Sequence, residues 1–151
     1  MIVELIAAAV GTVAFALLFG VPRRYYVTCA WIGAVDWLVY KLLLPYFAAA
    51  SFPVFFATAV AILCSRFMAV RRRCPATVFM ITGIFPLVPG AQIYWAAYYL
   101  VTNQFDEALA SGFAAIKAIV AIVLGIIFVF ELPNRFFHLA GRKSGENAAK
   151  S

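Results

Sequence analysis

Long apolar stretches separated by short polar segments dominate this chain. Five stretches can be marked, at about residues 2–20, 27–44, 51–70, 76–101 and 106–130. Each is close to the roughly 20 residues that a helix needs to cross a bilayer. The pattern predicts an all-α polytopic membrane protein with five transmembrane helices in residues 1–133, followed by a basic cytoplasmic tail in residues 134–151.

The fourth stretch is interrupted at its centre, where residues 82–94 read TGIFPLVPGAQIY. Proline lacks a backbone donor and clashes with the preceding turn, so the fourth helix is predicted to break at Pro86-Leu87-Val88-Pro89-Gly90. Irregular backbone at membrane depth persists only where it is buried in protein or lines a cavity, and broken helices form substrate sites in transporters. The break therefore indicates a solute pathway, with a simple packing kink as the alternative.

Composition supports membrane insertion and narrows the chemistry. Hydrophobic residues make up 66% of the 151 residues, charged residues 12%, and the mean hydropathy is +0.99, whereas soluble domains are about half apolar. The net charge of +6 comes from basic residues between the apolar runs, which favours topology signals and lipid contacts over nucleic-acid binding. Three scattered cysteines and one histidine support no disulfide framework, metal site or cofactor.

The basic residues also orient the predicted helices. Arg23 and Arg24, residues 71–73 and the tail share one side if there are five spans, whereas Glu4 and Asp106 lie on the other. By the positive-inside rule, the amino terminus is expected outside and the carboxyl terminus in the cytoplasm of a cell (inner) membrane. The alternative is a re-entrant pair in place of the fourth span, which gives four spans and places the tail with Glu4.

Candidate binding groups follow the break directly. A half-helix that begins near Gly90 turns its free N–H groups and positive dipole end toward the membrane interior, which suits a carboxylate. Pro86, Pro89 and Gly90 form this break, and Gln92 and Tyr94 carry the nearest polar side chains. The preceding half-helix ends near Phe85 with free carbonyls, which suit an ammonium group or a coupling cation.

Two further patterns concern helix packing. Residues 110, 114, 118 and 121 are alanines and residue 125 is glycine, a spacing that lets helices approach closely, either within this bundle or against a second protein. Arg66 precedes the arginine cluster by five residues and is expected to extend to the headgroups. Trp31, Trp37, Trp95 and Tyr98 are expected to be interfacial anchors.

Several motifs resemble one family. They are residues 15–23 (FALLFGVPR), Gly33-Ala34, residues 74–79 (CPATVF), residues 84–90 (IFPLVPG) and Tyr94. Over about residues 11–133, the chain resembles the small subunit of split threonine/serine exporters. The resemblance implies that the protein is not an enzyme. It implies instead half of a two-component exporter, whose larger subunit supplies about five further helices and a cytoplasmic domain. Threonine and serine are the first substrates implied; some members export dicarboxylates such as succinate.

Two charges depart from that pattern. Asp36 stands where a small residue is usual, and Lys117 lies in a span of alanine and branched apolar residues. Ionisable groups near a helix centre usually face a cavity or a partner. We expect the two either to pair across the second and fifth helices or to accompany a transported zwitterion, with a structural ion pair that has no role in transport as the alternative.

Two other classes of function are compared with the exporter. A non-transporting membrane scaffold or accessory protein is an alternative function that the sequence leaves open. A second copy of the chain is an alternative to the larger subunit as the partner. An intramembrane enzyme is poorly supported, because the sequence has no metalloprotease motif, no nucleophile elbow and no facing pair of aspartates.

Overall fold

The computed structural model describes residues 1–132, which are helical throughout, apart from short connections, and contain no strand. The predicted tail lies outside these residues. Six α-helices and three short 3₁₀ helices follow one another in the order α1 (Ile2–Leu18), η1 (Arg23–Tyr25), α2 (Tyr26–Leu43), η2 (Leu44–Tyr46), α3 (Ser51–Arg72), α4 (Thr77–Ile84), η3 (Phe85–Leu87), α5 (Gly90–Val101) and α6 (Phe105–Glu131).

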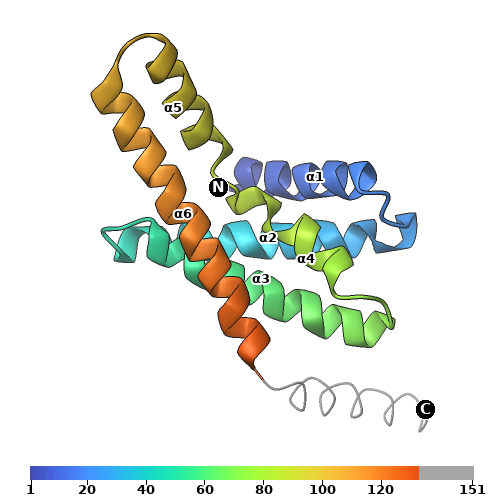
Figure 1. Cartoon of the computed structure of the whole chain (residues 1–151). Coiled ribbons are helices and arrows are strands. Elements are labelled where there is room, and N and C mark those ends of the chain that lie inside the picture. Colours follow the sequence, from blue (N-terminus) through green and yellow to red (C-terminus); the bar gives the residue numbers. More distant parts are fainter. Residues whose placement is uncertain (133–151) are drawn as a thin grey trace, which may run out of the picture.

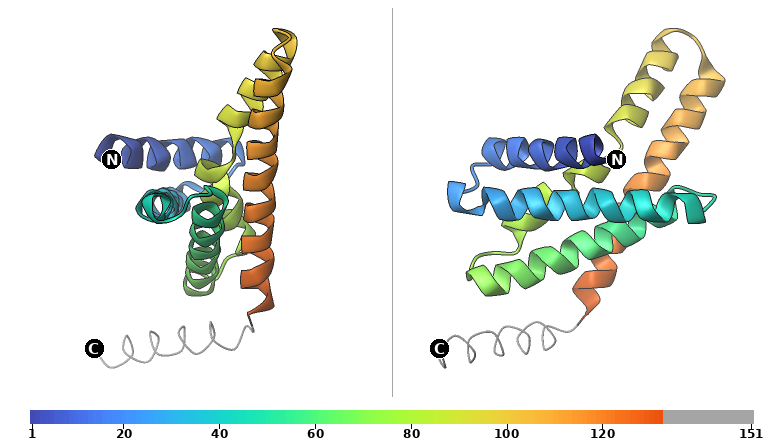
Figure 2. Two further views of the ribbon diagram at one scale, coloured as in Figure 1. Left: turned by 90° about the vertical axis from the view of Figure 1, so that its left-hand side faces the viewer. Right: turned by 180° about the vertical axis from the view of Figure 1, so that it is seen from behind.

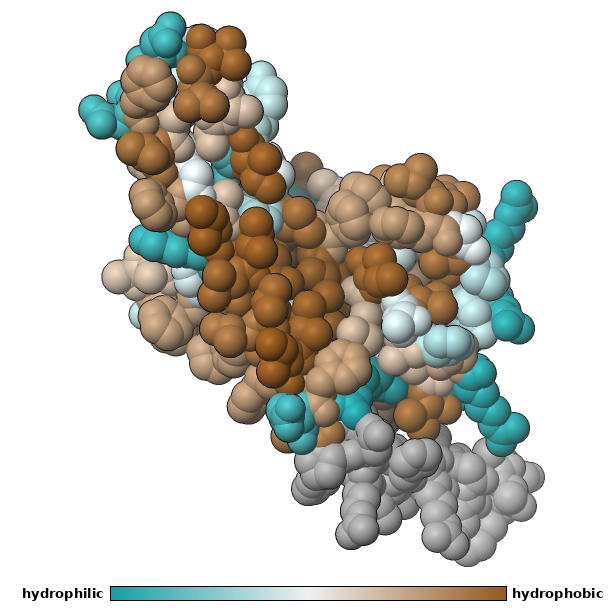
Figure 3. Space-filling model, in the orientation of Figure 1, coloured by the Kyte–Doolittle hydropathy of each residue, from teal (hydrophilic) through white to brown (hydrophobic). Residues whose placement is uncertain are grey.

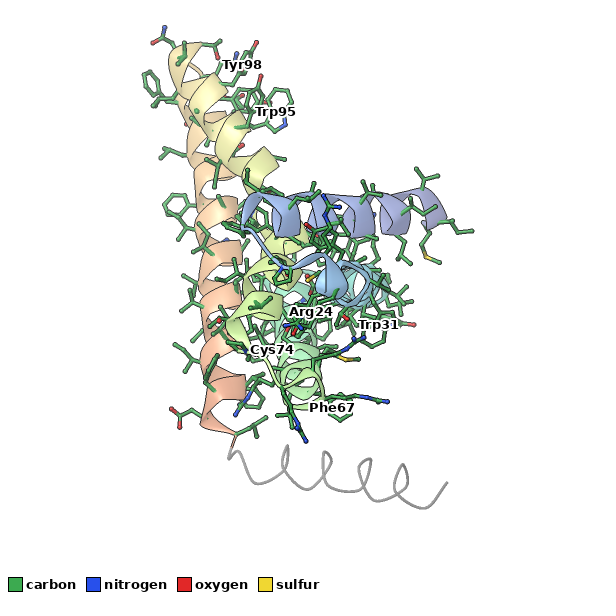
Figure 4. The ribbon with its side chains drawn as sticks, turned by 90° about the vertical axis from the view of Figure 1, so that its right-hand side faces the viewer. Arg24, Trp31, Phe67, Cys74, Trp95 and Tyr98 are labelled. Atoms are coloured by element: carbon green, nitrogen blue, oxygen red, sulfur yellow. The ribbon has the colours of Figure 1, made fainter. Side chains whose placement is uncertain are left out.

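Helices α1, α2 and α3 lie side by side in alternating directions (Figure 1). Gly33 allows the close approach of α1 to α2, because a Cβ atom at this position would lie 2.0 Å from the Thr12 hydroxyl oxygen. At one end of the pair, Lys41 Nζ lies 3.1 Å from Glu4 Oε1. The connections that carry the arginines, α1 to α2 and α3 to α4, lie together at the opposite end (Figures 1 and 4).

Helix α6 crosses this layer and packs against α3 (Figure 1). Gly125 sits at the crossing, where an added Cβ would lie 3.0 Å from both the Phe55 carbonyl oxygen and Thr58 Cβ. Ala121 is buried at the same contact. The predicted small-residue surface of this helix is therefore used inside the chain at its carboxyl-terminal half.

Helices α5 and α6 form a hairpin that extends beyond the other helices (Figures 1 and 2). Helix α5 packs against α6 and has no buried residue. In Figure 3 the visible face is mainly apolar, with hydrophilic residues at the tip of the hairpin and at the end of the molecule where the arginine-bearing connections lie. The hairpin thus presents an apolar surface that residues 1–132 do not cover.

Three helical segments in residues 1–132 are long and apolar enough to cross a membrane: Arg23–Tyr46, Ser51–Arg72 and Phe105–Glu131. The bent pair Thr77–Leu87 and Gly90–Val101 would make a fourth span. Helix α1 is apolar but shorter, with 17 residues. The chain is therefore an all-α membrane protein with three or four candidate spans by length.

Candidate functional site

The break in the fourth apolar stretch lies where the sequence predicts it. Because Pro86 has no N–H, the carbonyl of Thr82 has no α-helical donor, and α4 ends at Ile84. One 3₁₀ turn follows, and Val88 adopts an extended conformation before α5 begins at Gly90. The two half-helices differ in direction by 50°.

The break borders a groove of about 740 Å³. It is lined by the break and the start of α5, with residues 86–89, 91 and 92, and by α6, with Ala110, Phe113, Ala114, Lys117 and Ala118. Trp37 and Tyr40 of α2 and residues 48–51 and 54 close its base. The amino-terminal half of the small-residue surface thus lines the groove, and only its carboxyl-terminal half packs on α3.

The polar side chains that line the groove belong to Trp37, Tyr40, Ser51, Gln92 and Lys117. Lys117 is its one charged lining residue within residues 1–132, and no aspartate or glutamate lines it. The N–H groups of Ala91 and Gln92 have no backbone acceptor in this part of the chain, and no side chain caps α5. A helix amino terminus and an ammonium group that line the same groove favour an anion there.

Four of the seven predicted site residues line this groove, namely Pro86, Pro89, Gln92 and Lys117. Gly90 begins α5 between them. Tyr94 is 62% exposed and is not a lining residue. Its ring stacks with that of Tyr98, at a centroid distance of 6.5 Å, on the α5 surface where Trp95 and Tyr98 also lie (Figure 4).

The expected pair of Asp36 and Lys117 is not formed. Asp36 is fully buried, and neither carboxylate oxygen has a hydrogen-bond partner within residues 1–132. Lys117 lies on the groove wall, whereas Asp36 lies on the face of α2 that packs inside the chain. Within residues 1–132, Lys41 forms an ion pair with Glu4 instead. Counting residues along each span predicts that both charges lie near the same depth. It does not predict which side of each helix carries them.

The structure defines the surroundings of two other residues. Arg66 is buried, donates hydrogen bonds to the carbonyls of Val129 and Leu132, and lies 5.4 Å from the Phe130 ring centroid. It therefore holds the carboxyl-terminal end of α6. The expected approach of Arg66 to the headgroups stays a prediction. Trp37 lines the groove, and its indole N–H has no acceptor in the described residues.

Comparison with known proteins gives a family. The sequence matches the family described as "Threonine/Serine exporter, ThrE" over residues 4–131. An uncharacterized protein of Haemophilus influenzae is 29% identical over 139 residues, which cover 89% of this chain and 47% of that protein. The chain thus spans about half the length of this relative. No solved structure matches the chain.

Proposed function

The chain belongs to the threonine/serine exporter family, and we propose that it is one half of a two-component exporter of small carboxylate-bearing solutes, with threonine and serine as the first candidates. The observation that carries this proposal is the groove at the helix break. Its free N–H groups and Lys117 provide positive potential, and its 740 Å³ volume suits a small solute.

In the proposed topology all five apolar stretches span the inner membrane, with the amino terminus outside and the carboxyl terminus in the cytoplasm. The 17 residues of α1 extend about 26 Å at 1.5 Å per residue. That is a few ångströms short of a hydrocarbon core of about 30 Å, a mismatch that local thinning accommodates at modest cost. Clustering of the arginine-bearing connections at one end supports the orientation.

The proposed partner is a larger subunit with about five further helices and a cytoplasmic domain. Helix α5 is apolar but has no buried residue, and its contacts are with α6. A second protein would cover this helix and complete the groove, as repeats do in transporters whose sites lie between two halves. The Haemophilus influenzae relative is about twice as long as the matched region, which leaves room for such a half in one chain.

Transport would begin with the substrate carboxylate at the N–H groups of Ala91 and Gln92, opposite Lys117. An amino acid also needs acceptors for its ammonium group. The carbonyls freed at the end of α4, including that of Thr82, are the nearest candidates from the broken helix. Movement of one half against the other would then expose the site to the opposite side.

A dicarboxylate such as succinate is the second candidate. Within the described residues, Lys117 lines the groove without any acidic side chain, so a second carboxylate has a partner there while an ammonium group has no carboxylate partner. A non-transporting scaffold is the third candidate, and in that case the groove residues would not affect export.

Reconstitution of the chain with its larger subunit in vesicles tests these candidates. Efflux of serine, threonine and succinate is compared for the parent and for Lys117→Gln, with Lys41→Gln as the matched control outside the groove. We expect Lys117→Gln to reduce export at least tenfold, which corresponds to about 1.4 kcal/mol of lost interaction. A larger loss for succinate than for serine assigns a dicarboxylate, whereas unchanged export by Lys117→Gln supports the scaffold.

A further inference from the structure

Asp36 lies on α2, the helix that contacts both α4 and η3, and it is not one of the residues that line the groove. One turn before it, Ile32 packs against α4, where a Cβ added at Gly83 would lie 2.7 Å from Ile32 Cγ2. One turn after it, Val39 and Tyr40 pack in the cluster that contains Leu87 of η3. Asp36 therefore lies on α2 between the contact with the end of α4 and the contact with η3.

Few charged groups surround this carboxyl group. Helix α4 and η3 contain no ionisable residue, and the one acidic residue of α1, Glu4, pairs with Lys41. On α3, the ionisable side chains within the bundle are Cys64, which is half-buried, and Arg66, which is directed to the end of α6. On α2, Cys29 is buried and Lys41 lies at the Glu4 ion pair.

A charged carboxylate at this place would be costly. Its two oxygens are acceptors only, yet neither has a donor in residues 1–132, and the side chain is fully buried. Removing an ionised carboxylate from water without a partner is strongly unfavourable, and a bound proton avoids that cost. A proton also turns one oxygen of the group into a hydrogen-bond donor.

We propose that Asp36 is a buried proton-binding site, and that release of its proton requires the packing between α2 and the helix break to loosen. The proton moves from the carboxylic acid to water once the site opens, and the carboxylate that remains is then hydrated. Protonation is thereby linked to the conformation of the break. This proposal does not depend on the transported solute, and its tests use the protein without substrate.

The first test is the pH dependence of stability for the purified full chain in detergent. A folded state that keeps one proton more than the unfolded state loses up to about tenfold in its folded-to-unfolded ratio for each unit of rising pH. Thermal unfolding of the parent is compared with that of Asp36→Asn, which keeps the shape but binds no proton, and of Asp106→Asn at the exposed end of α6. We expect the extra loss at high pH to be absent from Asp36→Asn and unchanged in Asp106→Asn.

Sodium ions are included as a competing occupant. If sodium raises the unfolding temperature of the parent but not of Asp36→Asn, the site holds a metal cation and the proposal is wrong. Superimposable pH curves for the parent and Asp36→Asn also overturn it.

The second test observes the proton directly by infrared spectroscopy. Subtracting the spectrum of Asp36→Asn from that of the parent at neutral pH should leave the C=O stretch of a protonated carboxylic acid. A difference spectrum with carboxylate bands in its place shows that Asp36 is ionised in the folded protein and contradicts the proposal.

Discussion

The absence of a side chain at Gly33 determines how closely α1 and α2 approach. Membrane helices associate through packing, because lipid tails are as apolar as the helices themselves. At Gly33 the neighbouring helix presents Thr12, whose hydroxyl donates its hydrogen bond to the Ala8 carbonyl within its own helix. Gly11, one residue before Thr12, faces open space and has no such contact.

We expect Gly33→Ala to destabilise the protein and Gly11→Ala to be tolerated. The Cβ added at Gly33 overlaps the Thr12 side chain, and overpacking of about 1–3 kcal/mol exceeds the ~1 kcal/mol by which alanine favours a helix. Thermal unfolding in detergent measures both variants, with a lower midpoint expected for Gly33→Ala alone. Equal midpoints would show that α1 is loosely packed on α2.

At the scale of elements, one proline-containing segment divides a span into two half-helices with opposite ends facing each other. The carboxyl end of α4 loses a donor at Pro86, and the amino end of α5 leaves the N–H groups of Ala91 and Gln92 free. The break thereby frees both carbonyl and N–H groups within one apolar stretch, and the stretch needs no charged side chain of its own to provide them. Lys117 on the facing helix adds to the positive end.

Replacement of Pro86, Pro89 and Gly90 by alanine should make the fourth helix continuous. Alanine has high helix propensity and restores the donors that proline lacks. The triple variant should insert at normal levels but lose export of serine, threonine and succinate, because the N–H groups proposed to bind the carboxylate become bonded within the helix. Pro22→Ala, at the exposed connection after α1, is the control. Normal export by the triple variant would reduce the break to a packing kink.

At the scale of the whole molecule, sequence patterns predict where the helices lie in the chain better than which side of each helix packs against its neighbours. The apolar runs, the break and the positions of Pro86, Pro89 and Gln92 follow from composition and proline chemistry. Which face of α2 turns inward depends on contacts such as Gly33 with Thr12, so counting along the chain could not separate Asp36 from Lys117. The hydrogen bonds of Arg66 could not be predicted for the same reason, since its acceptors, the carbonyls of Val129 and Leu132, are far away along the chain.

The proposed orientation makes a direct topological prediction. Reporter fusions near Cys74 and at Gly141 should give a cytoplasmic signal, because the arginines precede the first site and the basic tail contains the second. A fusion near Ala49, in the connection between η2 and α3, should report the outside. A cytoplasmic signal at Ala49 would contradict the five-span arrangement.

Assembly is the last property that the whole molecule predicts. The groove is lined by the break, the start of α5, α2, the segment leading into α3 with its first residues, and α6, while α5 has no buried residue in the described part of the chain. We therefore expect the purified chain to transport nothing in liposomes by itself, and to export solute only when the larger subunit is reconstituted with it. Parallel vesicles with the larger subunit alone serve as the control. Full transport by this chain alone would mean that the groove is completed without the larger subunit, by this chain or by a second copy, and cross-linking of the active preparation would distinguish these two arrangements.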